Sequence, residues 1–305
     1  MPIFESKTHI ICADSPYPFR PRENSRPLIF MHIPKCAGTS LDTCLSKRWE
    51  ASRQFKLLGP TLYGGFQDYD SFGPNVRHWI HEDWQNCPVD IDYAAGHAGA
   101  KWFDRLYSNG QKCTVLREPK MRILSHWLYW RTFSEADIGN WGTYTPRLEL
   151  ARCDLISFIS APELASQIDN VIVRMLLYPH PLIPGDDFIP PEHDADLIAD
   201  AIEAIDQFDF VGVIEDSELI SKLEAWLGYS LVLTSENISR PVPEDLRHPL
   251  RQDLTHDTWA ILEARSRLDQ CVWDYVVEKY VQANPRTMQV SAVAHSINRF
   301  AELMR

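Results

Sequence analysis

The chain has 305 residues, of which 45% are hydrophobic, and a formal net charge of −12 at pH 7. The acidic balance, without a basic stripe or arm, argues against a nucleic acid as partner. No segment reaches the ~18 uninterrupted apolar residues of a membrane span. The seven cysteines show no paired spacing, which favours a reducing compartment.

Residues 1–26 are rich in proline and arginine and predict an extended arm. This stretch has no apolar run led by lysine or arginine, so we expect no signal peptide and a cytoplasmic protein. The rest of the chain is long enough for one large α/β domain or two smaller ones. We expect a single domain over 27–285 and a separate C-terminal helix over 286–305.

Residues 28–41 predict a buried strand, a tight loop and the start of a helix. The loop contains Lys35 and Gly38, and Thr39 and Ser40 fall in the first helical turn. Backbone N–H groups at a helix N-terminus, two hydroxyls and a cation together suit a phosphate. The pattern is not a Walker A loop, in which a lysine directly precedes the serine or threonine. The alternative is an ordinary strand–turn–helix connection, which would not need the lysine.

Two stretches, 50–90 and 133–150, are rich in aromatic residues and weakly periodic. Exposed aromatics beside a transfer site often stack on sugars or apolar acceptors. The alternative, which the sequence supports at least as well, is that these rings pack on one another as a satellite of the core. The first stretch also holds potential metal ligands whose spacing matches neither H-E-x-x-H nor H-x-x-E-H, so we expect no metal there. These residues are His78, His81, Glu82 and Cys87.

A short apolar run over 93–97 predicts a strand that ends in His97. We expect this strand to lie beside the one before Lys35, and Gly96 to let an acceptor approach His97 closely. A neutral imidazole with a pKa near ~6.5 can take a proton at neutral pH. The alternative is a structural histidine held between small residues.

Residues 112–131 predict a second strand that leads into a helix. Arg117 ends the strand, Pro119 falls at the first helical position, and Ser125 lies about two turns into the helix. Parallel sheets bind ligands at the carboxyl ends of their strands, so two strands that each end near a cation suit a ligand with two separated phosphates. Alternatively, Arg117 pairs with Glu118 or caps a helix, and Ser125 is a neutral helix-surface residue.

The sequence after residue 150 predicts mainly helices, with one strand over 208–213. A helix over 217–227 ends before Gly228, a frequent stop signal. Two further helices are expected over 256–281 and 288–305. The last is a candidate for packing on a partner, which would include a second copy in a homo-oligomer.

The two strand–helix segments together resemble the sulfotransferases that use 3′-phosphoadenosine 5′-phosphosulfate (PAPS), in their carbohydrate and heparan-type branch. The family motif H-I-P-K-x-x-G-T-S is matched over 32–40, and R-E-P-x-x-R-x-x-S-H is matched over 117–126. Weaker similarity continues over 169–176, 208–215 and 269–280. The resemblance implies a P-loop-like α/β fold with a central parallel sheet flanked by helices and a helix-rich C-terminal half. Because no N-terminal anchor like that of the Golgi members is visible, we expect a bacterial or otherwise soluble member.

The resemblance also assigns roles on the donor side. The 5′-phosphate would be held by the loop amides with the Thr39 and Ser40 hydroxyls, while Lys35 would stabilise charge on the leaving phosphate. Arg117 and Ser125 would read the 3′-phosphate, for which a planar guanidinium is better suited than an ammonium. No metal is implied, because the leaving group lacks the polyphosphate charge of ATP. The expected donor-binding residues are Lys35, Cys36, Ala37, Gly38, Thr39, Ser40, Arg117 and Ser125.

On the acceptor side, the resemblance implies His97 as the general base, with His32 and His126 as rivals. The acceptor would be a hydroxyl or amine of a carbohydrate or small molecule, and the net charge weighs against a polyanionic one. A loose similarity suggests that a loop with Asn237 and Ser239 approaches the nucleotide.

Two other functions stay open. A P-loop-type nucleotide kinase would bind ATP with Mg²⁺, and the missing G-K-[ST] order counts against it. A non-catalytic nucleotide-binding protein of the same fold would keep the donor site and lose the acceptor site.

Overall fold

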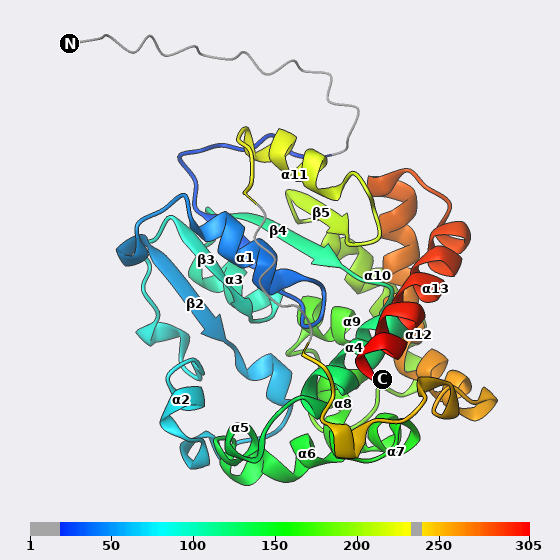
Figure 1. Cartoon of the computed structure of the whole chain (residues 1–305). Coiled ribbons are helices and arrows are strands. Elements are labelled where there is room, and N and C mark those ends of the chain that lie inside the picture. Colours follow the sequence, from blue (N-terminus) through cyan, green and yellow to red (C-terminus); the bar gives the residue numbers. More distant parts are fainter. Residues whose placement is uncertain (1–18, 233–239) are drawn as a thin grey trace.

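A computed structural model describes residues 19–232 and 240–305. In these residues the strands form one parallel sheet in the order β2-β3-β1-β4-β5 (Figure 1). The strands are β1 Leu28–Met31, β2 Gln54–Leu58, β3 Tyr93–His97, β4 Gln111–Leu116 and β5 Phe210–Val213. The chain places β2 and β3 on one side of β1 and then β4 and β5 on the other. The expected α/β class with a central parallel sheet is therefore confirmed.

Helices surround the sheet and make up most of the chain after β4. The α-helices are α1 Gly38–Ser46, α2 Pro74–Arg77, α3 Ala100–Leu106, α4 Pro119–Arg131, α5 Glu135–Gly139, α6 Thr145–Glu149, α7 Leu155–Ser160, α8 Ala165–Ile168, α9 Val171–Leu177, α10 Asp194–Ile205, α11 Leu219–Leu227, α12 His256–Val276 and α13 Pro285–Leu303. A π-helical turn, Val277–Val281, extends α12. As predicted, Pro119 begins α4, and α11 stops at Gly228, whose φ of 75° is left-handed.

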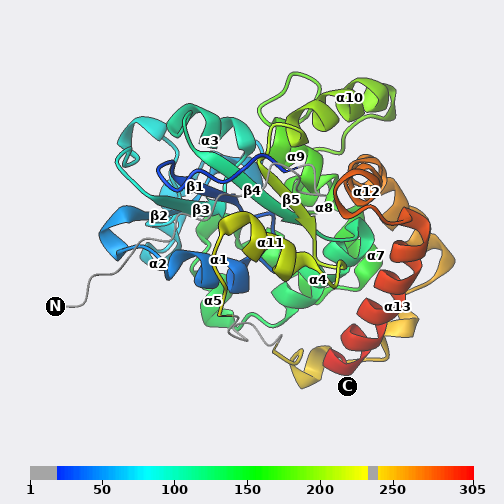
Figure 2. The same ribbon diagram turned by 90° about the horizontal axis from the view of Figure 1, so that it is seen from above.

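The central strand is apolar throughout because both of its faces are covered. Successive side chains of a strand point to opposite faces. Leu28 and Phe30 accordingly pack in the core layer of α1 and α11, whereas Ile29 and Met31 pack in the larger core on the other face. Figure 2 shows α1 and α11 on one side of the sheet and α3 and α9 on the other.

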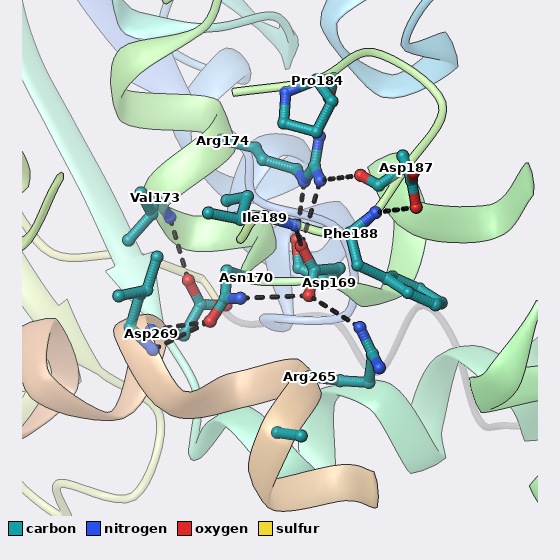
Figure 3. Close-up of polar contacts among 12 residues, drawn as sticks. Asp169, Asn170, Val173, Arg174, Pro184, Asp187, Phe188, Ile189, Arg265 and Asp269 are labelled. Carbon is teal, nitrogen blue, oxygen red and sulfur yellow. Dashed lines mark hydrogen bonds and ion pairs between the residues drawn. The ribbon is translucent and has the colours of Figure 1, made fainter. Parts of the chain in front are cut away.

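A buried polar network joins α9 to α12 behind the sheet (Figure 3). The Asp169 carboxylate, fully buried, accepts a hydrogen bond from Arg174 Nη2 at 3.0 Å. Asp269 of α12 accepts from the backbone N–H groups of Ile172 and Val173, at 3.0 and 2.9 Å, and so caps the first turn of α9. The weakly similar segments 169–176 and 269–280 therefore meet here. Because these carboxylate oxygens are satisfied by the protein itself, we assign the network a structural role.

The C-terminal helix packs on its own chain. One face of α13 contacts α4, and its residues Ala292, Ser296 and Phe300 are buried. This face is therefore covered by the chain itself, and packing on a partner stays a prediction for the rest of the helix surface. Its period of three to four residues is the same whichever surface covers it, so the pattern alone could not distinguish the two.

The edge strand β2 lies in the stretch 50–90, where no strand was predicted. Lys56 interrupts its short apolar run, and the lysine ammonium pairs instead with Asp42 of α1 at 2.8 Å. The rest of this stretch and the stretch 133–150 supply aromatic rings that pack on one another; for example, the ring centroids of Tyr63 and Tyr144 lie 5.5 Å apart. The satellite-core interpretation is confirmed for Tyr63, Phe66, Tyr69, Phe72, Trp141 and Tyr144.

The described end of the N-terminal arm is held against the domain. The Trp226 indole N–H donates to the backbone oxygen of Arg20 at 2.8 Å, and the Phe19 ring lies 4.5 Å from that of Phe210. Residues 19 and 20 thus lie against β5 and α11, and Arg22 and Arg26 donate hydrogen bonds to Gln111 and to the backbone oxygen of Asn109 at the start of β4. Among the described helices, none has the length and apolar character that crossing a membrane requires.

Candidate functional site

The loop between β1 and α1 has an unusual backbone. Lys35 and Ala37 have φ values of 68° and 58°, in the left-handed region, where a residue other than glycine costs ~1–2 kcal/mol. Such conformations persist only where the surroundings enforce them, and they gather at ligand sites. Ala37 is the N-cap of α1, and no side chain among the described residues caps that end of the helix. The N–H groups in the first turn of α1 therefore receive no hydrogen-bond acceptor from the N-cap side chain.

Gly38 is required by packing. A Cβ at this position would lie 1.8 Å from Cδ2 of His32, so only glycine leaves room for the imidazole. The sequence predicted the glycine as part of a phosphate loop, and the structure adds a reason that is independent of any ligand. Thr39 is exposed and Ser40 is half-buried, both in the first turn of α1 as expected.

The Lys35 ammonium lies over the ring of Tyr129, 3.6 Å from its centroid. Burial lowers the pKa of Lys35 to about 7, and the nearby Arg117 guanidinium contributes in the same direction. An aromatic face attracts a cation but does not neutralise it. Burial therefore destabilises the ammonium form of Lys35, and an approaching anion would stabilise it.

Arg117 connects the second motif to the first. Its Nη1 donates to the backbone oxygen of Lys35 at 3.3 Å, and its Nη2 donates to Oγ of Ser296 at 3.3 Å. Its Nε is buried without a hydrogen-bond partner among the described residues. The alternative pairing with Glu118 is wrong, because that carboxylate instead caps α4 by accepting from the N–H of Met121 at 2.8 Å.

Two other donor-site residues lie less favourably. Ser125 is half-buried on α4, and its hydroxyl makes no hydrogen bond to any residue that the structure describes. It does not line the cleft beside Arg117 described next. Cys36 is buried, and burial raises the pKa of its thiol to about 12, so this side chain is not a nucleophile at neutral pH.

A cleft of ≈ 680 Å³ opens at the carboxyl ends of β4 and β5. The sheet side contributes Ala37, Arg117 and Glu215, and the opposite wall is α13. Burial raises the pKa of Glu215 to about 7. Sequence reasoning missed the contribution of α13 altogether. The signal that was available is the polar spacing of His295, Ser296 and Arg299, which repeats on one helical face.

His97 ends β3, which pairs in parallel with β1 as predicted. Its Nδ1 lies 2.6 Å from the backbone oxygen of His32. Because that oxygen can only accept, Nδ1 carries the proton and Nε2 keeps its lone pair. Burial, with a smaller contribution from the Lys35 ammonium, lowers the pKa of His97 to about 4. The imidazole is thus held neutral and in one tautomer.

Gly96 does not serve an acceptor. Its φ is 152°, and a Cβ there would lie 1.9 Å from the backbone oxygen of Leu57 on β2. The close pairing of β2 with β3 requires this glycine, so the expectation that it opens an approach to His97 is wrong.

The two rival histidines are less suited to act as a base. The His32 ring is packed between that of His97, with centroids 4.1 Å apart, and that of Phe30, 5.7 Å away; burial lowers its pKa as it does that of His97. His126 is 3% exposed, and neither ring nitrogen has a hydrogen-bond partner among the described residues. Its ring packs edge-on against Trp130 at 4.4 Å. An acceptor could not reach it without opening the core.

Within residues 19–232 and 240–305, no group of three or more histidine, cysteine, aspartate or glutamate side chains could hold a metal ion. The six cysteines in these ranges are free thiols. Asn237 and Ser239, the loop residues expected near the nucleotide, lie outside the described residues. A comparison with models of known protein families gave no match, and a search among curated proteins gave none either.

Proposed function

We propose that the protein is a sulfotransferase of P-loop-like fold that transfers a sulfuryl group from PAPS to a hydroxyl or amine of a carbohydrate or small molecule. The observation that carries this proposal is the contact between Arg117 and the backbone oxygen of Lys35. It joins, at one cleft, two motifs that lie 82 residues apart in the chain. A ligand with two separated anionic groups matches two separate cations at the ends of β1 and β4.

In this proposal the 5′-phosphate lies at the N-terminus of α1, near the Thr39 and Ser40 hydroxyls. The 3′-phosphate lies at Arg117, whose buried Nε has no hydrogen-bond partner in the described part of the chain, which supports an anionic partner. The half-buried Ser125 stands in the matching motif but apart from the cleft, so we give it a secondary part in binding.

The transfer forms one bond to sulfur, breaks another and moves one proton. The acceptor oxygen or nitrogen attacks sulfur, the bond from sulfur to the bridging phosphate oxygen breaks, and adenosine 3′,5′-bisphosphate leaves. Lys35 stabilises the negative charge that develops on that bridging oxygen. The acceptor proton goes to Nε2 of His97, the candidate base, whose other nitrogen is fixed by the His32 carbonyl.

Ligand-induced thermal shifts test the donor class. Adenosine 3′,5′-bisphosphate should raise Tm much more than 5′-AMP or ADP at equal concentration, and the shift should persist in EDTA. Equal shifts from all three nucleotides would overturn the proposal. A larger shift from ATP with Mg²⁺ would favour the nucleotide kinase instead.

A further inference from the structure

The C-terminal helix faces the cleft with a row of polar side chains that the proposed mechanism does not use. Ser291, His295 and Arg299 recur every four residues of α13 and line the wall opposite Arg117. Phe300, the residue after Arg299 on α13, is 3% exposed and anchors the helix in the core. The Arg117 guanidinium lies 5.2 Å from the centroid of that ring. The position of Arg117 is thus set partly by α13.

Ser296 forms the direct link between the two walls. It is 6% exposed, and its hydroxyl oxygen accepts the hydrogen bond from Arg117 Nη2 at 3.3 Å. A hydroxyl that accepts from a guanidinium keeps its own proton for another acceptor. In the cleft, that proton can be donated to a ligand oxygen held by the same arginine.

Two guanidinium groups, of Arg117 and Arg299, and one carboxylate, of Glu215, line the cleft. The charge of Arg299 lowers the pKa of Arg117, after the larger effect of burial, whereas the charge of Glu215 raises it. In the described part of the chain, neither arginine has a carboxylate within the 4.0 Å of an ion pair. One oxygen of Glu215 already accepts from the N–H of Glu118 at 2.9 Å. The two guanidinium groups outnumber this carboxylate, whose pKa burial raises to about 7, and they favour an anion between them.

We propose that α13 completes the donor site, with Arg299 and Ser296 acting beside Arg117 to hold the 3′-phosphate and so to distinguish the donor from nucleotides that lack it. This inference rests on the proposed function and adds to it a specificity-determining wall from the C-terminal helix. Arg299 is exposed at the mouth of the cleft, where it can close on a phosphate from the side opposite Arg117.

Calorimetric titration of adenosine 3′,5′-bisphosphate and of 5′-AMP into wild type and variants tests the inference. Arg299→Ala should weaken the bisphosphate by about 10- to 100-fold, the usual worth of a charged hydrogen bond, and leave 5′-AMP within about twofold. Ser296→Ala should act in the same direction more weakly. The matched control is Arg286→Ala, which removes the same charge from an exposed position of α13 that does not line the cleft.

The outcomes separate the two proposals. If wild type prefers the bisphosphate but Arg299→Ala keeps that preference, the role of α13 is overturned and the proposed function stands. If Arg299→Ala weakens both ligands equally, or no more than Arg286→Ala does, the helix acts only through general charge and the inference is likewise overturned. If wild type itself does not distinguish the two nucleotides, the proposed function fails and the inference fails with it.

Discussion

Arg117 donates a hydrogen bond to the backbone oxygen of Lys35 at 3.3 Å. The arginine follows β4 and the lysine follows β1, and these two strands are neighbours in the sheet. The contact therefore sets the spacing between the two cations that we assign to the two phosphates. Four consequences can be measured.

Replacement of Lys35 separates chemistry from binding. Lys35→Ala should lower the rate of sulfuryl transfer strongly, because the lysine acts mainly on charge that develops in the transition state. The free energy of binding adenosine 3′,5′-bisphosphate should fall less in this variant than in Arg117→Ala, for which we expect a loss of ~2–4 kcal/mol. Single-turnover release of the bisphosphate from PAPS in the presence of the acceptor is the measurement. An unchanged rate in Lys35→Ala would mean that the loop has another role.

The affinity for the bisphosphate should depend on pH through Lys35, whose pKa is about 7 without ligand. A bound phosphate stabilises the ammonium, so above pH 7 binding must take up a proton. Affinity should therefore fall as the pH rises above 7, and the total fall should be no larger than the loss that Lys35→Ala causes at pH 7. Titrations between pH 7 and 9 in phosphate-free buffer would measure this slope.

The variants identify which group carries that slope. Glu215 gains negative charge over the same range, since its pKa is also about 7, and it repels the ligand in the same direction. Lys35→Ala should keep only the smaller Glu215 contribution, and Lys35→Ala with Glu215→Gln should give a flat profile. A full slope in the double variant would show that neither group is responsible.

His97 should be needed for transfer but not for donor binding. His97→Asn keeps an N–H that can donate to the His32 carbonyl while removing the base, so it should fold normally and bind the bisphosphate as wild type does. Transfer should fall by about 10²–10⁴-fold. Because the pKa of His97 is about 4, the wild-type rate should stay level from pH 8 down to about 5 as far as this group is concerned, and fall only toward pH 4. Near-normal transfer in His97→Asn would return this residue to a structural role.

Gly38 should be essential for the packing of the loop even without ligand. Gly38→Ala places a Cβ against the His32 ring and should lower the free energy of unfolding by about 1–3 kcal/mol, as overpacking does. The matched control is Gly139→Ala, where a Cβ meets no atom within 4 Å and the change should stay within about 0.5 kcal/mol. Thermal or urea unfolding of the two variants makes the comparison, and equal stabilities would contradict the packing argument.

The sequence predicted the parts of the fold whose signals are local. The apolar runs before Pro34 and Arg117 became β1 and β4 because a strand buried on both faces needs apolar residues throughout. Pro119 and Gly228 marked helix boundaries through their backbone preferences. β2 was missed because an edge strand needs only a half-buried, interrupted pattern, here broken by Lys56.

The site was predictable only where the motif itself supplies the geometry. Lys35, Ala37 and Arg117 meet because their strands are neighbours at the carboxyl edge of the sheet. The roles of Gly96 and of α13 depend on contacts with Leu57 and Arg117 that are distant in sequence, and no local pattern encodes them. The pKa values of Lys35 and His97 follow from burial, which a sequence does not give.

The most direct test of the account is a crystal structure of the protein with adenosine 3′,5′-bisphosphate bound. We expect the 3′-phosphate within about 3 Å of the Arg117 guanidinium and the 5′-phosphate at the N-terminus of α1 beside Lys35. A nucleotide bound away from the cleft beside Arg117, or bound there with its 3′-phosphate in solvent, would contradict the central claim.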